Sequence, residues 1–202
     1  MRLPKVSATN YHKIITIFDK NLFVKSLITI LFILFSFNFN FSQAIFSTTQ
    51  DGSWSTPVSD PSSPWSLVSG IDSDGIPDGN DDVILNNVVT LPSSNINIGT
   101  ILINVTGHLI LNSQSYKLFI DKVNSTITNN GEVSGSGTIE IRQNVCTISG
   151  SGTWSSDIYF RINRNTIFDG VDLVLNSNFL LRLGGSATVN SNSSLSFNNK
   201  VF

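Results

Sequence analysis

The sequence is poor in charge, in cysteine and, beyond its first quarter, in alanine. Charged residues make up 13% of the 202 positions, and after Ala44 alanine occurs only at Ala187. This shortage of strong helix formers argues against helices, whereas short runs of Val, Ile, Leu and Thr favour β-strands. The single cysteine, Cys146, excludes an internal disulfide, and its apolar neighbours predict a buried side chain.

Basic residues are also scarce beyond the N-terminus. From residue 43 on, the chain holds seven basic and 13 acidic residues, a net charge of −6. Nucleic-acid binding needs a basic face. The composition therefore predicts no nucleic-acid partner.

Residues 1–43 have the pattern of a signal peptide with an extended basic region. Lys20 and Lys25 precede an apolar run over residues 27–35, and small residues follow at Ser42 and Ala44. The run is short for a membrane span, so we expect none in the mature chain, although a retained anchor is the alternative. Cleavage near Ser42 to Ala44 would place the protein outside the cell or on its surface.

Residues 44–82 are rich in Trp, Pro and Ser and read as a loop. A loop of this length is unusual unless it packs on something. Its largest apolar groups are Trp54 and Trp65. We expect the two indoles to cover the open end of the β-structure that follows, and a sugar-stacking platform is the alternative.

The same segment ends in an acidic stretch. Asp72, Asp74, Asp78 and Asp81 supply carboxylates at short intervals around two glycines, which suits the oxygen-rich, flexible sites that Ca²⁺ prefers. The spacing from Asp72 to Asp78 resembles the Asp-x-Asp-Gly-x-x-Asp loops of thrombospondin type 3 repeats. These four residues are candidate Ca²⁺ ligands, and we expect no other cofactor. The alternative is a solvated acidic turn.

Residues 83–202 are a series of short apolar runs separated by Asn, Ser and Gly, which indicates all-β structure. Residues 109–113 recur as residues 173–177, displaced by 64, which fits three coils of about 21 residues. Residues 134–139 recur as residues 149–154, displaced by 15, which does not fit that period. We predict a right-handed parallel β-helix (β-solenoid) with an N-terminal loop cap. A β-sandwich is the alternative.

The order of Trp54, Trp65, residues 75–77, residues 81–84 and residues 88–91 resembles the opening of G8-like modules. Such modules begin many secreted β-helix proteins, including large surface proteins of the Bacteroidetes type. The resemblance covers about residues 51–112 and implies a fold and an extracellular setting. It implies no catalytic role for any residue here.

The sequence contains few candidate catalytic residues. Asp169 and Asp172, near Arg161 and Arg164 in sequence, form the one local cluster of carboxylates and bases, and His108 reads as a turn residue. We therefore expect an exported structural or adhesion-type module that contacts glycans or other surface proteins. One alternative is a polysaccharide lyase or glycoside hydrolase on a β-helix. Another is a non-functional fragment of a larger surface protein, since the last residues read as one more strand.

Overall fold

The computed structural model describes residues 43–198, apart from residues 80, 177 and 178. The predicted signal peptide therefore lies outside the described residues, except for Gln43. The described part consists of strands and turns without helices, so it holds no helix that is long and apolar enough to cross a membrane. The strands are β1 (Ile45–Thr48), β2 (Gly52–Ser53), β3 (Trp65–Ser69), β4 (Asp82–Leu85), β5 (Val88–Thr90), β6 (Ile96–Ile98), β7 (Thr100–Ile103), β8 (His108–Leu111), β9 (Lys117–Ile120), β10 (Ser125–Asn129), β11 (Glu132–Gly135), β12 (Thr138–Ile141), β13 (Cys146–Ser149), β14 (Thr153–Trp154), β15 (Tyr159–Ile162), β16 (Asn165–Asp169), β17 (Asp172–Leu175), β18 (Phe179–Leu181), β19 (Ser186–Val189) and β20 (Ser194–Phe197).

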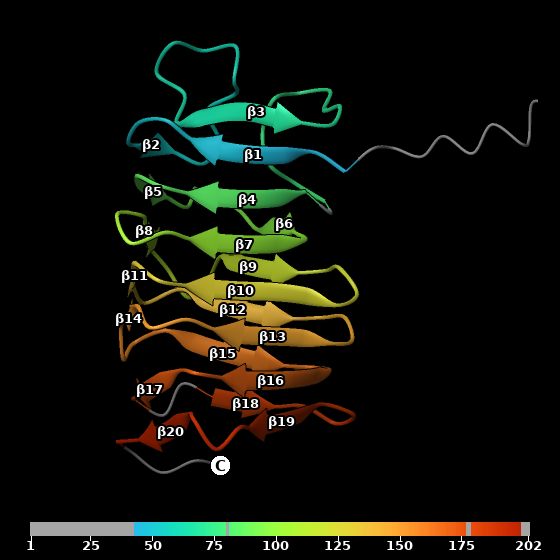
Figure 1. Ribbon diagram of the computed structural model, residues 1–202, viewed down its shortest axis with the longest axis vertical. Coiled ribbons are helices and arrows are strands. Elements are labelled where there is room, and N and C mark those ends of the chain that lie inside the picture. Colours follow the sequence, from blue (N-terminus) through green and yellow to red (C-terminus); the bar gives the residue numbers. More distant parts are fainter. Residues whose placement is uncertain (1–42, 80, 177–178, 199–202) are drawn as a thin grey trace, which may run out of the picture. The chain divides into compact units, whose positions relative to one another are not determined.

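Every third strand pairs in parallel with the next, so the chain winds as a β-solenoid (Figure 1). The first sheet stacks β4, β7, β10, β13, β16 and β19; the second stacks β2, β5, β8, β11 and β14; the third stacks β6, β9, β12, β15 and β18. A short fourth sheet pairs β17 with β20. The predicted β-helix is confirmed, and the parallel register excludes the β-sandwich. The right-handed sense of the coil stays a prediction.

Aliphatic side chains stacked along the solenoid axis form the core. Alternate residues of each strand point inward, as the two-residue period of a strand requires. The first sheet contributes a row of buried residues in register, namely Val83, Ile101, Ile127, Ile148 and Phe168. The other two sheets contribute similar rows, and because one coil cannot bury its apolar face alone, the stack of coils creates the core.

The two sequence repeats have different structural meanings. The 64-residue repeat spans three coils. Leu109 pairs with Val133, and Val133 pairs with Trp154, which accounts for two of them. A hydrogen bond from the Asn176 amide to the Ser156 carbonyl places β17 one coil further on. The 15-residue repeat instead marks two different corners of the coil, because Gly135 ends β11, before the third sheet, and Gly150 follows β13, before the second sheet. Both glycines have φ near +90° (89° and 102°), and a Cβ at either would overlap a carbonyl of the preceding coil.

The N-terminal end differs from the prediction of a loop over residues 44–82. Residues 45–48 form β1, which pairs in parallel with β4, and residues 65–69 form β3, which lies antiparallel on the other edge of β1. The solenoid thus begins at β1 and not at Val83. Sequence patterns missed both strands because each is only four or five residues long and lies in a segment rich in Ser and Pro, which reads as a loop. Pairing with β4 fixes β1, and pairing with β1 fixes β3.

Trp54 and Trp65 cover the N-terminal end of the β-structure, as predicted. Their side chains are buried, with exposed fractions of 0% and 3%, and their rings pack edge to face with centroids 4.9 Å apart. Neither indole offers an open face to a sugar ring, so the stacking platform is excluded for this pair. The indoles close the N-terminal end of the core instead.

Candidate functional site

The acidic loop over residues 72–81 is held against the cap by hydrogen bonds. Trp54 Nε1 donates to the Pro77 carbonyl at 2.9 Å, and the Val58 amide donates to the Gly75 carbonyl at 2.9 Å. Gly75 has φ of 74°, a value that glycine adopts without strain. The buried indole therefore fixes the position of the carboxylates.

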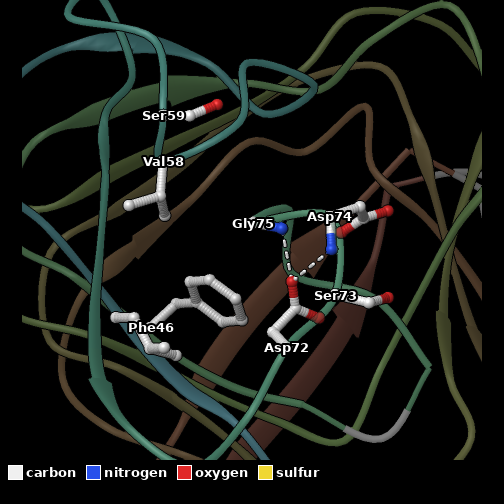
Figure 2. Close-up of a pocket in the computed structure, with 8 residues that line it drawn as sticks. Phe46, Val58, Ser59, Asp72, Ser73, Asp74 and Gly75 are labelled. Carbon is white, nitrogen blue, oxygen red and sulfur yellow. Dashed lines mark hydrogen bonds between the residues drawn. The ribbon is translucent and has the colours of Figure 1, made fainter.

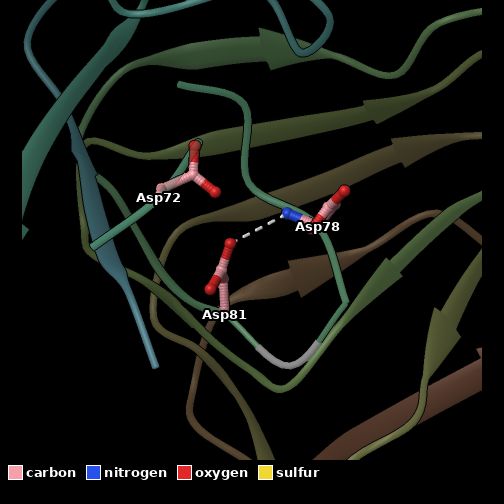
Figure 3. Close-up of side chains that lie close together, drawn as sticks. All are labelled: Asp72, Asp78 and Asp81. Atoms are coloured by element: carbon pink, nitrogen blue, oxygen red, sulfur yellow. Dashed lines mark hydrogen bonds between the residues drawn. The ribbon is translucent and has the colours of Figure 1, made fainter. Parts of the chain in front are cut away.

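Three of the four predicted calcium ligands lie together (Figure 3). One carboxylate oxygen from each of Asp72, Asp78 and Asp81 lies within 4.8 Å of the others. Oxygens at that separation can each lie about 2.4 Å from one Ca²⁺. Asp74 is not part of this group. Its Oδ1 accepts a hydrogen bond from the Ile76 amide at 2.9 Å.

Backbone amides already use several of these carboxylate oxygens. Asp72 Oδ2 accepts hydrogen bonds from the amides of Asp74 and Gly75, as an Asx turn does. Asp81 Oδ1 accepts from the Ala44 amide and Oδ2 from the Asp78 amide, each at 3.1 Å. With or without a metal, Asp72 therefore stabilises the turn of the loop, and Asp81 joins the loop to Ala44, next to β1.

The cluster is electrostatically unfavourable without a cation. Burial, and then the charges of Asp74, Asp81 and Asp72, raise the pKa of Asp78. Burial also raises the pKa of Asp81, outweighing the hydrogen bonds from the amides of Asp78 and Ala44, and the charges of Asp72 and Asp74 add to it. A bound cation or a proton would relieve this repulsion.

A pocket of about 340 Å³ adjoins the acidic loop (Figure 2). Phe46, Val58 and Leu67 give it an apolar wall. Asp72 and Asp74 give it an acidic rim. Its chemistry suits a small group that carries both apolar surface and positive charge.

A second cluster, centred on Glu140, lies on the outer face of the third sheet. Glu140 Oε2 accepts hydrogen bonds from Lys117 Nζ at 3.1 Å and from an Arg161 guanidinium nitrogen at 3.2 Å, and Oε1 accepts from Asn163 Nδ2 at 2.9 Å. Only 7% of the Glu140 side chain is exposed. Burial by itself raises the pKa of Glu140, but the bonds from Asn163 and Lys117 and the charges of Lys117 and Arg161 outweigh it, so the pKa lies below its ordinary value.

Arg142 extends this cluster toward the first sheet. One of its guanidinium nitrogens bonds Asp121 at 3.3 Å, Nε lies 3.8 Å from Glu140 Oε1, and Cζ lies 3.1 Å from the centroid of the Phe119 ring. The arginine thus combines two ion pairs with a stacked aromatic contact. Sequence reasoning missed the cluster because its members come from separate coils.

The carboxylates considered for catalysis are not brought together with arginines. Asp169 accepts a hydrogen bond from Asn190 at 2.9 Å, and Asp172 accepts one from Ser194 at 2.7 Å. Within residues 43–198, no ion pair joins either of them to Arg161 or Arg164. The ion-paired cluster of Asp169 and Asp172 with Arg161 and Arg164, suggested by sequence proximity, is therefore not formed.

The predictions for His108 and Cys146 can each be compared with the structure. His108 begins β8 instead of lying in a turn, and its Nε2 lies 2.6 Å from Ser134 Oγ. Cys146 is buried, as predicted, and burial raises the pKa of its thiol to about 11. A thiol with that pKa stays protonated near neutral pH and is a poor nucleophile.

The chain matches no protein-family model, no curated protein and no solved structure. The resemblance to G8-like modules therefore stays a prediction, and function rests on the geometry of this molecule alone.

Proposed function

We propose that this protein is an exported structural module of the adhesion type, whose long outer faces contact glycans or other surface proteins. One observation carries the proposal: the described chain is built as a capped stack of coils whose outward positions are mostly polar. On the first sheet, for example, Thr100, Thr126 and Thr147 stand in one outward row. A stack of this kind offers extended, regular surfaces, which suit long ligands.

The N-terminal pattern supports export as part of the proposal. Gln43 and Ala44 belong to the fold, because the Ala44 amide donates to Asp81 Oδ1 and Gln43 Oε1 accepts from Lys122 Nζ at 2.7 Å. Cleavage after Ser42 would keep both contacts, whereas cleavage after Ala44 would remove them. We therefore place the cleavage before Gln43.

Calcium binding is proposed for the acidic loop alone, with Asp72, Asp78 and Asp81 as the protein ligands. The convergence of their oxygens within 4.8 Å supports it. The ion would stabilise the loop next to the cap and has no proposed part in any reaction.

The function is tested by expressing the full chain with its own N-terminus in a bacterial host and fractionating the culture. We expect the protein in the medium or on the cell surface, with a mature sequence that begins at Gln43, and we expect the purified protein to be retained on cells or on immobilised polysaccharides. Retention without release of new reducing ends supports an adhesive module. Depolymerisation of a polysaccharide, or recovery of the protein only from the cytoplasm with Met1 in place, would refute the proposal.

A further inference from the structure

The basic residues of the solenoid gather on one edge. All six lysines and arginines between residues 43 and 198 lie in the third sheet or in the corner that leads from it to the first sheet. We call this set the basic strip; it consists of Lys117, Lys122, Arg142, Arg161, Arg164 and Arg182. Net charge alone hid this arrangement, because the carboxylates outnumber the cations and most of them lie on other parts of the fold.

The strip follows the solenoid axis. Strand β12 pairs in parallel with β9 on one side and with β15 on the other. Lys117 on β9 therefore lies one coil before β12, and Arg161 on β15 lies one coil after it. The backbone amide of Arg142 donates a hydrogen bond to the Ile120 carbonyl, and that of Arg182 donates one to the Ile162 carbonyl. The two arginines therefore occupy equivalent corner positions. Successive coils are about 4.8 Å apart, and each coil from β9 to β18 carries one or two of the cations.

Carboxylates neutralise only part of the strip. Asp82 pairs with Lys122, Asp121 with Arg142, and Glu140 with Lys117 and Arg161. Arg164 and Arg182 are exposed and, in the described part of the chain, form no ion pair with a carboxylate. A guanidinium presents a planar fork that matches a carboxylate or sulfate group. The end of the strip that carries Arg164 and Arg182 is therefore the part most available to an anion.

We propose that the basic strip binds an acidic polysaccharide, a glycan with carboxylate or sulfate groups along its length, which lies parallel to the solenoid axis. The proposal deepens the adhesive function above and rests on it. Duplex DNA carries about one negative charge per 1.7 Å, which is denser than one or two cations per coil of about 4.8 Å. A glycan whose acidic groups are separated by sugar rings matches the sparser spacing better.

The test is retention of the purified full chain on immobilised polygalacturonate, with neutral amylose and duplex DNA as the other two surfaces. The double variant R164Q/R182Q removes the two cations that have no carboxylate partner. The control V105E/S151E lowers the net charge equally at exposed corner positions between the first and second sheets, away from the strip. Thermal unfolding of each variant checks that it is folded, which we expect because all four side chains are exposed.

We expect the wild type to bind polygalacturonate at low salt, to release it as salt screens the charges, and to bind amylose weakly. R164Q/R182Q should lose about fivefold in affinity, the sum of two exposed charge pairs, and V105E/S151E less than about twofold. Equal binding by both variants, no binding by the wild type, or tighter binding to DNA would overturn the proposal. Retention of the wild type on cells or on amylose, but not on polygalacturonate, would leave the adhesive function standing and refute the strip alone.

Discussion

Replacing Glu140 by glutamine should lower the free energy of unfolding by about 2 kcal/mol. Removing one partner of a buried ion pair costs about 3–5 kcal/mol, because the other charge is left without compensation. The partners here keep some contact with water, since the side chains of Lys117 and Arg161 are 26% and 19% exposed, and this reduces the cost. For a domain of this size the loss corresponds to roughly 6 °C in the melting temperature.

The effect should depend on pH in a defined direction. The pKa of Glu140 in the folded protein lies below its ordinary value of 4.5. Its stabilising contribution is therefore fully present above the unfolded pKa and is lost as the pH falls through the folded pKa. The difference between wild type and E140Q should be constant from pH 7 to about pH 6 and should shrink in acid.

Thermal and urea unfolding, followed by circular dichroism between pH 3 and 7, measure both effects. E132Q is the matched control, because Glu132 lies on a strand of the same coil but its side chain is 52% exposed. Its ion-pair contact is a long one, 3.6 Å from Oε1 to His108 Nε2. E132Q should change the stability by less than about 0.5 kcal/mol. If E140Q and E132Q unfold together at pH 7, or if the gap does not close in acid, the Glu140 cluster does not stabilise the fold as described.

Three further predictions concern the cap and the corners. About 1 mM Ca²⁺ should raise the melting temperature of the wild type but not of D72N/D78N/D81N, and an unchanged wild type would remove the calcium proposal. In the presence of a metal chelator at pH 7, D78N should be more stable than the wild type. The pKa of Asp78 is raised in the folded protein, so its ionised form lowers the stability of the fold. A drop in the melting temperature of D78N would contradict this reading. G150A should destabilise by several kcal/mol, because a Cβ there overlaps the Asn129 carbonyl, whereas G79A meets nothing within 4 Å and should cost only about 1 kcal/mol for its φ of 53°; similar unfolding curves would show that this corner is not tightly packed.

Strand positions were predicted well wherever a strand's own residues determine it. The apolar runs at residues 83–85, 109–111 and 138–141 coincide with β4, β8 and β12, because buried aliphatic residues and polar corners alternate there. The strands β1 and β3 escaped because their stability comes from pairing with each other and with β4. Such pairing is not encoded in local composition.

The candidate sites were predicted less well, for a reason that follows from the fold. The acidic loop is continuous in sequence, so three of its four predicted ligands do converge. The Glu140 cluster joins residues 21 and 23 positions apart, one coil in each direction. Only the coil register reveals that Lys117, Glu140 and Arg161 are neighbours. A search for opposite charges displaced by about one coil would have found them.

The unequal coil lengths have a consequence for how this molecule tolerates change. From Val83 to Ile101 a coil takes 18 residues, and from Ile101 to Ile127 it takes 26, yet the inward rows stay in register. The surplus is absorbed at the corners, where the chain is exposed and loop closure depends only weakly on length. Val105, 82% exposed in one such corner, is therefore a position where an inserted peptide should be accommodated, and the solenoid can serve as a frame that carries foreign segments at a chosen height along its axis.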